Sequence, residues 1–207
     1  MKVNGISSPP AGTDLVGYET LIRFIKRKGL LHRPGDIVEI GTFLGGGAFK
    51  LAKYLERMRS RKLIYVIDIF NIECDKTMNT ENVEMSSLYE RALQHFNGKS
   101  QWDIFTEVTN NCYNIRVIKG DSKGIHIPAT DICFAFIDGN HDPTYVENDF
   151  YLIWNRLVPN GVIAFHDYKW DLPKVTEKID EIILKHRSDI YNIYNNKHKH
   201  IIYITKK

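Results

Sequence analysis

The sequence has few cysteines, no long apolar run and little excess charge of either sign. Its three cysteines, Cys74, Cys112 and Cys133, are far apart and form no CxxC pair, which argues against a zinc ribbon or a disulfide framework. Free thiols fit a reducing compartment, so we expect a cytoplasmic protein. The longest unbroken apolar stretch, Ile132 to Ile137, is far below the roughly 18 residues of a membrane-spanning helix, and the first residues show no apolar core of an export signal.

Charge and composition limit the kinds of molecule that this protein is expected to bind. Lys and Arg number 28 against 25 Asp and Glu, a formal charge of +3. This small excess does not predict a nucleic-acid surface, which usually shows as a clustered basic face. We expect a small-molecule substrate, with neither nucleic acid nor a membrane as partner, and leave open a homo-oligomer. The 207 residues, 43% of them hydrophobic, favour a single globular domain over residues 1–207.

Five short runs are mainly apolar instead of alternating, at residues 37–40, 63–67, 115–118, 132–137 and 162–165, with Glu39 and Arg116 as their charged members. Strands buried on both faces have this pattern. Helical stripes lie between them, at residues 48–58, 142–157 and 171–182, the last two with Asp142 and Asp171 as expected caps. The alternation predicts an α/β fold: a Rossmann-like, doubly wound, mostly parallel sheet of about seven strands with helices on both faces. Residues 190–194 and 200–205 are expected to close it as an antiparallel hairpin.

Two further segments stand outside this alternation. Residues 13–31 predict an opening helix, capped by Thr13 or Asp14, with Leu15 on its apolar stripe. Residues 69–114 are longer than an ordinary crossover and are expected to hold two helices, around 81–96 and 100–108. Long insertions on the ligand edge of a sheet often act as lids. The alternative to a lid is that residues 69–114 only add packing against the sheet.

Acidic residues occur in or directly after all five predicted parallel strands: Glu39, Asp68, Asp121, Asp138 and Asp167. Because the carboxyl ends of parallel strands meet at one edge, we expect these acids to share one rim. Crowded carboxylates are costly unless cations or hydrogen-bond donors balance them. The rim should therefore bind a ligand that carries hydroxyls, an ammonium and a sulfonium, or a divalent metal ion. Helix capping explains any one acid, but not all five together.

The glycines from Gly41 to Gly47 match neither common phosphate-binding motif. Counted from Gly45, the sixth position of a dinucleotide fingerprint is Lys50, and a Walker A loop ending at Ser100 would need glycine where Leu93 stands. We therefore expect a turn that lets a different ligand approach the backbone closely.

Three stretches carry a resemblance to a known family. Residues 38–46, VEIGTFLGG, resemble motif I of the class I S-adenosylmethionine-dependent methyltransferases, and Asp68 stands where that family has its ribose-binding acid. Residues 136–149 and 157–168 are similar to the branch that contains metal-dependent sugar O-methyltransferases and cephalosporin-hydroxylase-like proteins. The resemblance covers roughly residues 35–168.

The resemblance implies a site role for each matching residue. Asp68 would bind the ribose of S-adenosylmethionine, and Asp121 with Ser122 the adenine region. The methionine part would lie against Glu39, Gly41, Thr42, Gly45 and Gly46, with Asp138 nearby. Asp138, His166 and Asp167 match metal-binding positions. His166 replaces a carboxylate found in several metal-dependent members, and imidazole suits Mn²⁺, Fe²⁺ or Zn²⁺ better than Mg²⁺, so the ion, Mg²⁺ or Mn²⁺, is left open.

These features predict a methyltransferase that acts on a hydroxyl of a small polar or sugar-like metabolite, mainly by positioning donor and acceptor. His141 is the expected general base, because imidazole titrates near neutrality, and Asp138 is the second catalytic candidate. The alternative for His141 is a group that orients the loop by bonding a carbonyl. Two other functions are kept: a metal-dependent hydroxylase-like enzyme using Asp138, His166 and Asp167, and a non-catalytic S-adenosylmethionine-binding module.

Overall fold

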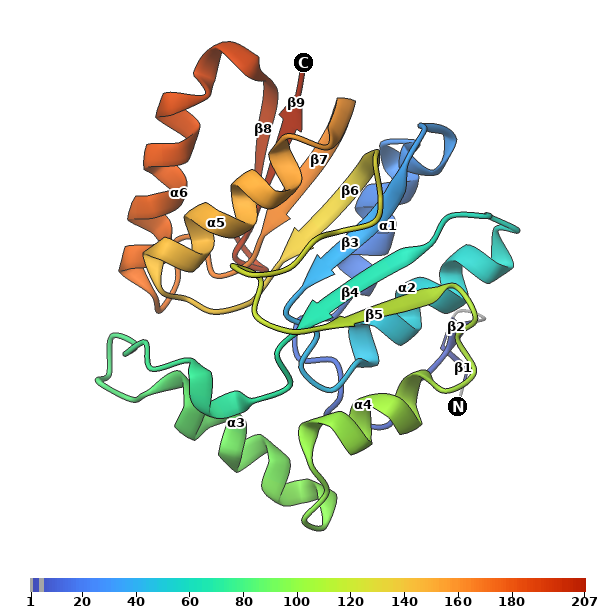
Figure 1. Cartoon of the computed structure of the whole chain (residues 1–207), viewed down its shortest axis with the longest axis vertical. Helices are drawn as coiled ribbons and strands as arrows, with labels where there is room; N and C mark the ends of the chain where they lie inside the picture. Colours follow the sequence, from blue (N-terminus) through green and yellow to red (C-terminus); the bar gives the residue numbers. More distant parts are fainter. Residues whose placement is uncertain (1, 4–5) are drawn as a thin grey trace.

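The computed structural model describes residues 2–3 and 6–207 and contains a seven-stranded sheet in the order β5-β4-β3-β6-β7-β9-β8 (Figure 1). Strands β3 to β7 are parallel, and β9 runs antiparallel to both β7 and β8. The strands are β3 (Asp36–Ile40), β4 (Ile64–Asp68), β5 (Ile115–Lys119), β6 (Ile132–Ile137), β7 (Leu157–Phe165), β8 (Ile190–Asn196) and β9 (Ile201–Lys206). The predicted fold and its closing hairpin are confirmed. A separate short pair joins β1 (Lys2–Val3) to β2 (Ile6–Ser7).

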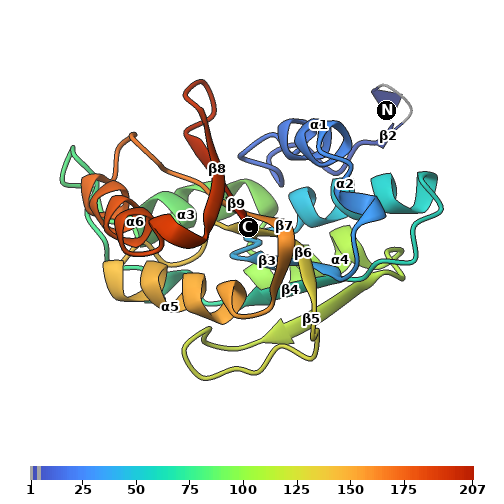
Figure 2. The same ribbon diagram turned by 90° about the horizontal axis from the view of Figure 1, so that it is seen from above.

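Helices cover both faces of the sheet (Figure 2). One apolar core joins the sheet to α1 (Glu19–Arg27), α2 (Gly46–Arg57) and α4 (Gln101–Thr109), and the other joins it to α5 (Pro143–Trp154) and α6 (Pro173–Lys185). Successive strand residues pack into opposite cores, as Ile37 and Val38 do. This explains why the strands are mainly apolar in sequence instead of alternating. Short 3-10 helices occur at Leu30–His32, Ile72–Cys74, Gln94–Phe96 and Arg187–Asp189.

The opening helix starts later than predicted. The Asp14 carboxylate accepts hydrogen bonds from the backbone N–H groups of Gly17 (2.9 Å) and Tyr18 (3.1 Å), so it closes a turn and α1 begins only at Glu19. Leu15 lies in this turn and is 63% exposed, so its expected place on a buried stripe is wrong. The side-chain bonding of Asp14 competes with the helix, a common property of this residue type.

Two other boundaries differ from the prediction. Strand β7 begins at Leu157, five residues early, because Leu157 already pairs with Ile132 before the register shifts. The residue before α6 is Leu172, and Asp171 makes no cap there. The Asp171 carboxylate instead accepts hydrogen bonds from the side chains of Asn79 (2.9 Å) and Thr80 in the inserted segment.

The inserted segment 69–114 contains α3 (Met85–Leu93) and α4, which agrees with the two predicted helices. Helix α4 begins with a capping box in which Ser100 and Asp103 bond each other's backbone N–H groups. It packs against α2 through Phe105, whereas α3 lies apart from the sheet, beyond the carboxyl ends of the strands (Figure 1). No helix among the described residues is both long and apolar enough to cross a membrane.

The turn after β3 gives a testable requirement for glycine. Gly41 has φ +81°, and a Cβ there would lie 2.1 Å from the backbone oxygen of Asp138, which cannot move without breaking the sheet. Gly98 has a similar φ of +75° with open space around it. We expect Gly98→Ala to cost about 1 to 2 kcal/mol for the left-handed backbone alone, and Gly41→Ala to cost clearly more. Urea unfolding of both variants checks this, and equal losses would contradict the packing argument.

Candidate functional site

Strand register places the predicted site residues in one row. Ile67, Ile40, Ile137 and Phe165 are paired across β4, β3, β6 and β7. The residues that follow these pairs are therefore neighbours at the carboxyl edge: Asp68, Gly41, Asp138 and His166. The parallel order thus gathers the acids that are far apart in the sequence, as expected for such a sheet.

A cavity of about 330 Å³ opens at this edge. Nine predicted site residues line it: Gly41, Thr42, Asp68, Asp121, Ser122, Asp138, His141, His166 and Asp167. Glu39, Gly45 and Gly46 are not among the described residues that line it. The inserted segment adds Asp75, Met85 and Tyr89, and the opening segment adds residues 13–16. Its size is that of a small-molecule site.

Much of the glycine-rich turn makes room for protein instead of ligand. A Cβ on Gly46 would lie 2.4 Å from the backbone of Thr13, and one on Gly47 would lie 2.4 Å from the Tyr18 ring. The Gly46 N–H also donates to the Thr13 carbonyl at 3.0 Å. The opening segment therefore lies directly on this turn and forms one wall of the cavity.

Glu39 is held by a residue of the opening segment. The Tyr18 hydroxyl donates a hydrogen bond to Oε1 of Glu39, whose side chain is buried. Burial, with the negative charges of Asp68 and Asp138, raises the pKa of Glu39 to about 8 against the hydrogen bond from Tyr18. Tyr18 itself lines the cavity, so this buried pair supports the wall behind which Glu39 lies.

The Asp68 carboxylate organises two loops. Oδ2 accepts from the backbone N–H groups of Thr42 (2.9 Å) and Phe43 (3.2 Å), and Oδ1 accepts from the Phe70 N–H (2.7 Å) and the Gln101 side chain (3.3 Å). Burial raises the pKa of Asp68, and these donors oppose that shift. Gln101 Oε1 is buried and has no hydrogen-bond partner. An unpaired buried acceptor beside Asp68 suits a ligand with hydroxyl donors.

The next strand end forms a second polar corner. Asp121 accepts from the Tyr145 hydroxyl at 2.8 Å, and the Lys123 ammonium lies 3.7 Å from the centre of the Tyr145 ring. Ser122 bonds Asp149, whose pKa burial raises to about 6. Asp121, Ser122, Tyr145 and Asp149 all line the cavity.

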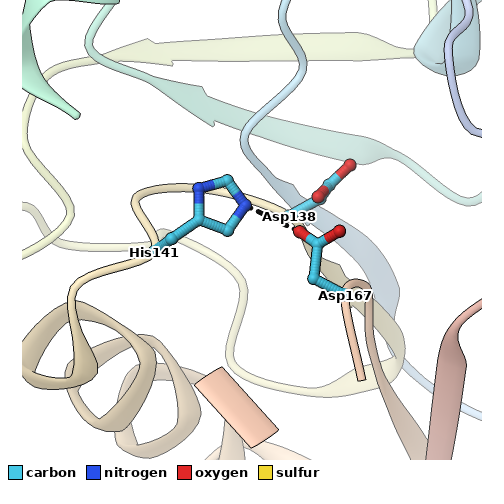
Figure 3. Close-up of side chains that lie close together, drawn as sticks. All are labelled: Asp138, His141 and Asp167. Atoms are coloured by element: carbon cyan, nitrogen blue, oxygen red, sulfur yellow. Dashed lines mark hydrogen bonds and ion pairs between the residues drawn. The ribbon is translucent and has the colours of Figure 1, made fainter. Parts of the chain in front are cut away.

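The two remaining rim acids, Asp138 and Asp167, lie beside the imidazoles of His141 and His166. One ligand atom from each of Asp138, His141 and Asp167 lies within 4.8 Å of the others (Figure 3). His166 Nδ1 lies 3.1 Å from Oδ1 of both Asp138 and Asp167. The predicted metal set of Asp138, His166 and Asp167 is thus brought together, and His141 joins it. Asp167 adopts φ +58° in the turn after β7, a left-handed backbone conformation that is uncommon for residues other than glycine.

His141 lies between two carboxylates. Its Nδ1 is 2.6 Å from Oδ2 of Asp75, and its Nε2 is 2.7 Å from Oδ2 of Asp167, with all three side chains almost fully buried. Burial favours the neutral imidazole, but the hydrogen bonds and charges of Asp167 and Asp75 outweigh it and raise the pKa of His141 to about 10. The pKa of Asp167 is lowered, because its bonds to both histidines outweigh burial. Both ring nitrogens are engaged in this arrangement, and the assignment of His141 as general base stays a prediction.

Sequence reasoning missed Asp75, Tyr18 and Gln101. Asp75 lies in the inserted segment, outside any strand end, and Gln101 is an ordinary helix residue by pattern. Tyr18 falls within the predicted opening helix, residues 13–31, where an aromatic residue indicates only core packing. No local signal marks these residues, because each reaches the site through tertiary packing.

Comparison with known proteins identifies a family and a fold. Residues 38–168 match the model of a family described as a methyltransferase domain. An uncharacterized protein of Acanthamoeba polyphaga mimivirus is 27% identical over 160 residues, which cover 76% of this chain and 63% of that relative. The match therefore spans less than two thirds of the relative's length.

Two solved structures show the same fold. The O-methyltransferase NovP aligns with a TM-score of 0.71 at 16% identity, over 93% of this chain and 80% of that chain. The methyltransferase MycE, in a complex with Mg, S-adenosylhomocysteine and mycinamycin VI, aligns with a TM-score of 0.56 at 14% identity, over 89% of this chain and 48% of that chain.

The His141 geometry predicts a pH-dependent stability. Its folded pKa of about 10 exceeds the roughly 6.5 of an unfolded histidine. The stabilisation is therefore complete below the lower value and is lost as pH rises towards the higher one. Between them, in metal-free buffer, wild-type unfolding free energy should fall more steeply than that of His141→Gln, by about 1.4 kcal/mol per pH unit. Urea unfolding at several pH values measures the slopes, with His198→Gln as the exposed-histidine control. Equal slopes for wild type and His141→Gln would contradict this assignment.

Proposed function

Because the chain belongs to the methyltransferase-domain family, we propose that it transfers the methyl group of S-adenosylmethionine to a hydroxyl of a small polar or sugar-like metabolite. The observation that carries this proposal is the row of Asp68, Gly41, Asp138 and His166 at the mouth of one cavity. Hydroxyl and cationic groups of the donor balance the carboxylates of this rim. The family match favours methyl transfer over the hydroxylase-like alternative.

The donor is assigned to the side of the cavity formed by β3, β4 and β5. Its ribose hydroxyls donate to Asp68 and to the unpaired Oε1 of Gln101. Its adenine lies towards Asp121 and Ser122, and its methionine part lies along Gly41 and Thr42. The sulfonium then faces the Asp138 end of the cavity.

The residues present fit a divalent ion. Asp138, His141 and Asp167 offer two carboxylates and an imidazole within 4.8 Å of one another, and oxygen and imidazole groups are ordinary ligands of divalent metals. When bound, such an ion supplies positive charge that lowers the pKa of an acceptor hydroxyl and orients it. The protein's own contribution is to hold donor and acceptor in line for displacement at the methyl carbon.

The acceptor is assigned to the mouth of the cavity beside His166. Trp170 and Leu15 line the cavity there although their side chains are 54% and 63% exposed. The Trp170 ring stacks on His200 with centroids 4.9 Å apart and lies 6.0 Å from the His166 ring. A fixed aromatic face beside charged groups suits a molecule with an apolar ring face and several hydroxyls, such as a sugar.

A substitution at the ribose position tests donor binding. We expect Asp68→Asn to weaken S-adenosylhomocysteine binding by about 1.5 to 3 kcal/mol, because the ribose loses charge-assisted hydrogen bonds. Asp36→Asn is the matched control, since Asp36 Oδ1 also accepts a backbone bond, from Leu63 at 2.9 Å, but at the opposite end of the sheet. Calorimetric titration of both variants gives the affinities. Equal affinities would remove Asp68 from the donor site.

Acids at the Asp138 end of the cavity should affect turnover without affecting the affinity for the donor. Asp167→Asn is expected to abolish methyl transfer and leave S-adenosylhomocysteine affinity within a few fold, because Asp167 follows β7, three strands away from β4 and Asp68 in the sheet order. Treatment with excess EDTA should have the same effect. Transfer of labelled methyl groups to a panel of sugars and glycosides measures this. Full activity in EDTA would remove the ion from the mechanism, and donor binding without transfer to any acceptor would favour the non-catalytic module.

A further inference from the structure

His141 has the contacts of a metal-ligating histidine, although the sequence assigned the ligand position to His166. Its Nε2 points towards the carboxylate of Asp167 and belongs to the group that also contains Asp138 (Figure 3). Ligand atoms of one ion with bonds of about 2.1 Å lie roughly 3 to 4.2 Å apart. For these atoms to share one ion, Nε2 and Asp167 Oδ2, which are 2.7 Å apart in a hydrogen bond, would separate slightly, and the widest pair in the group, at most 4.8 Å apart, would close slightly.

The other ring nitrogen is held from the inserted segment. Asp75 Oδ2 lies 2.6 Å from Nδ1, while Asp75 Oδ1 accepts the Thr77 N–H at 3.1 Å. The same stretch is tied to the loop of His141 by a hydrogen bond from the Asn140 side chain to the Cys74 carbonyl (3.0 Å). Metal-bound histidines almost always donate their second N–H to a carboxylate or carbonyl, which fixes the ring. Asp75 stands in that position.

We propose that His141 binds a divalent transition-metal ion through Nε2, and that Asp75 is the positioning residue that orients its ring through Nδ1. This inference rests on the divalent ion of the proposed function. Metal binding replaces the proton of Nε2, while the Nδ1 proton remains bonded to Asp75.

A nitrogen ligand has a consequence for the choice of ion. Mg²⁺ takes oxygen ligands, whereas imidazole favours Fe²⁺, Co²⁺ or Zn²⁺. His166 Nδ1 is a second imidazole nitrogen 3.1 Å from Asp138 and Asp167. The site therefore selects a transition metal over Mg²⁺. Because Asp75 belongs to residues 69–114, this segment must be docked for the site to be complete.

Co²⁺ is the probe for this arrangement, because proton resonance of a Co²⁺ site shows the N–H of a bound histidine as a strongly shifted, exchangeable signal. We expect wild type to bind Co²⁺ more tightly than Mg²⁺ and to give such a signal, which His141→Gln removes. Asp75→Ala should broaden the signal by exposing the N–H to exchange and weaken Co²⁺ binding 10- to 100-fold. Asp75→Asn should restore the signal in part, because its amide oxygen accepts the same bond.

Asp171→Asn is the matched control. Asp171 also fastens the inserted segment to the rim, through Asn79 and Thr80. It should therefore leave the shifted signal unchanged. The proposal is overturned if Co²⁺ does not bind, if His141→Gln keeps every shifted N–H signal, or if Asp171→Asn and Asp75→Ala have equal effects. Titration of the same samples with S-adenosylhomocysteine reports the donor site separately, so its failure is distinguishable from failure of the metal assignment.

Discussion

Repulsion among carboxylates crowded at the carboxyl edge of the sheet is the physical constraint that shapes this site. The parallel register brings Asp68 and Asp138 to one edge, and the turn after β7 adds Asp167. Charges of one sign in a partly desolvated cavity would destabilise the fold unless they are balanced. Backbone donors and Gln101 satisfy Asp68, whereas two imidazoles lie between the other acids. The two halves of the cavity are thus balanced by different chemistry, which suits a hydroxyl-rich donor on one side and a cation on the other.

The segments outside the sheet complete the site. The opening segment lies on the glycine turn through Thr13 and supports Glu39 through Tyr18. The inserted segment supplies Gln101 beside Asp68 and Asp75 beside His141. The inserted segment therefore contributes to both halves of the cavity, and the opening segment forms part of its wall. The lid role of residues 69–114 stays a prediction.

The sequence predicts the parts of this structure that depend on periodicity and strand order. Runs apolar on both faces specify buried parallel strands, and acids at their ends must then share one edge, so Asp68, Asp138 and Asp167 could be found in advance. Leu15 and Asp171 were misassigned because an aspartate side chain can cap a helix, close a turn or bond a distant loop, and the sequence pattern does not distinguish these roles. Asp14 closes a turn and leaves Leu15 outside the helix, and Asp171 bonds the inserted segment. Asp75 and Gln101 could not be predicted, because their roles depend on how the inserted segment docks.

The proposed function depends most on the binding of an adenosyl donor with a cationic centre at the acidic rim of the cavity. Calorimetric titration of the metal-free protein with S-adenosylmethionine, S-adenosylhomocysteine and NAD tests it most directly. We expect both adenosyl ligands to bind at one site per chain, and we expect NAD not to compete with them. Binding of NAD without binding of either adenosyl ligand would contradict it.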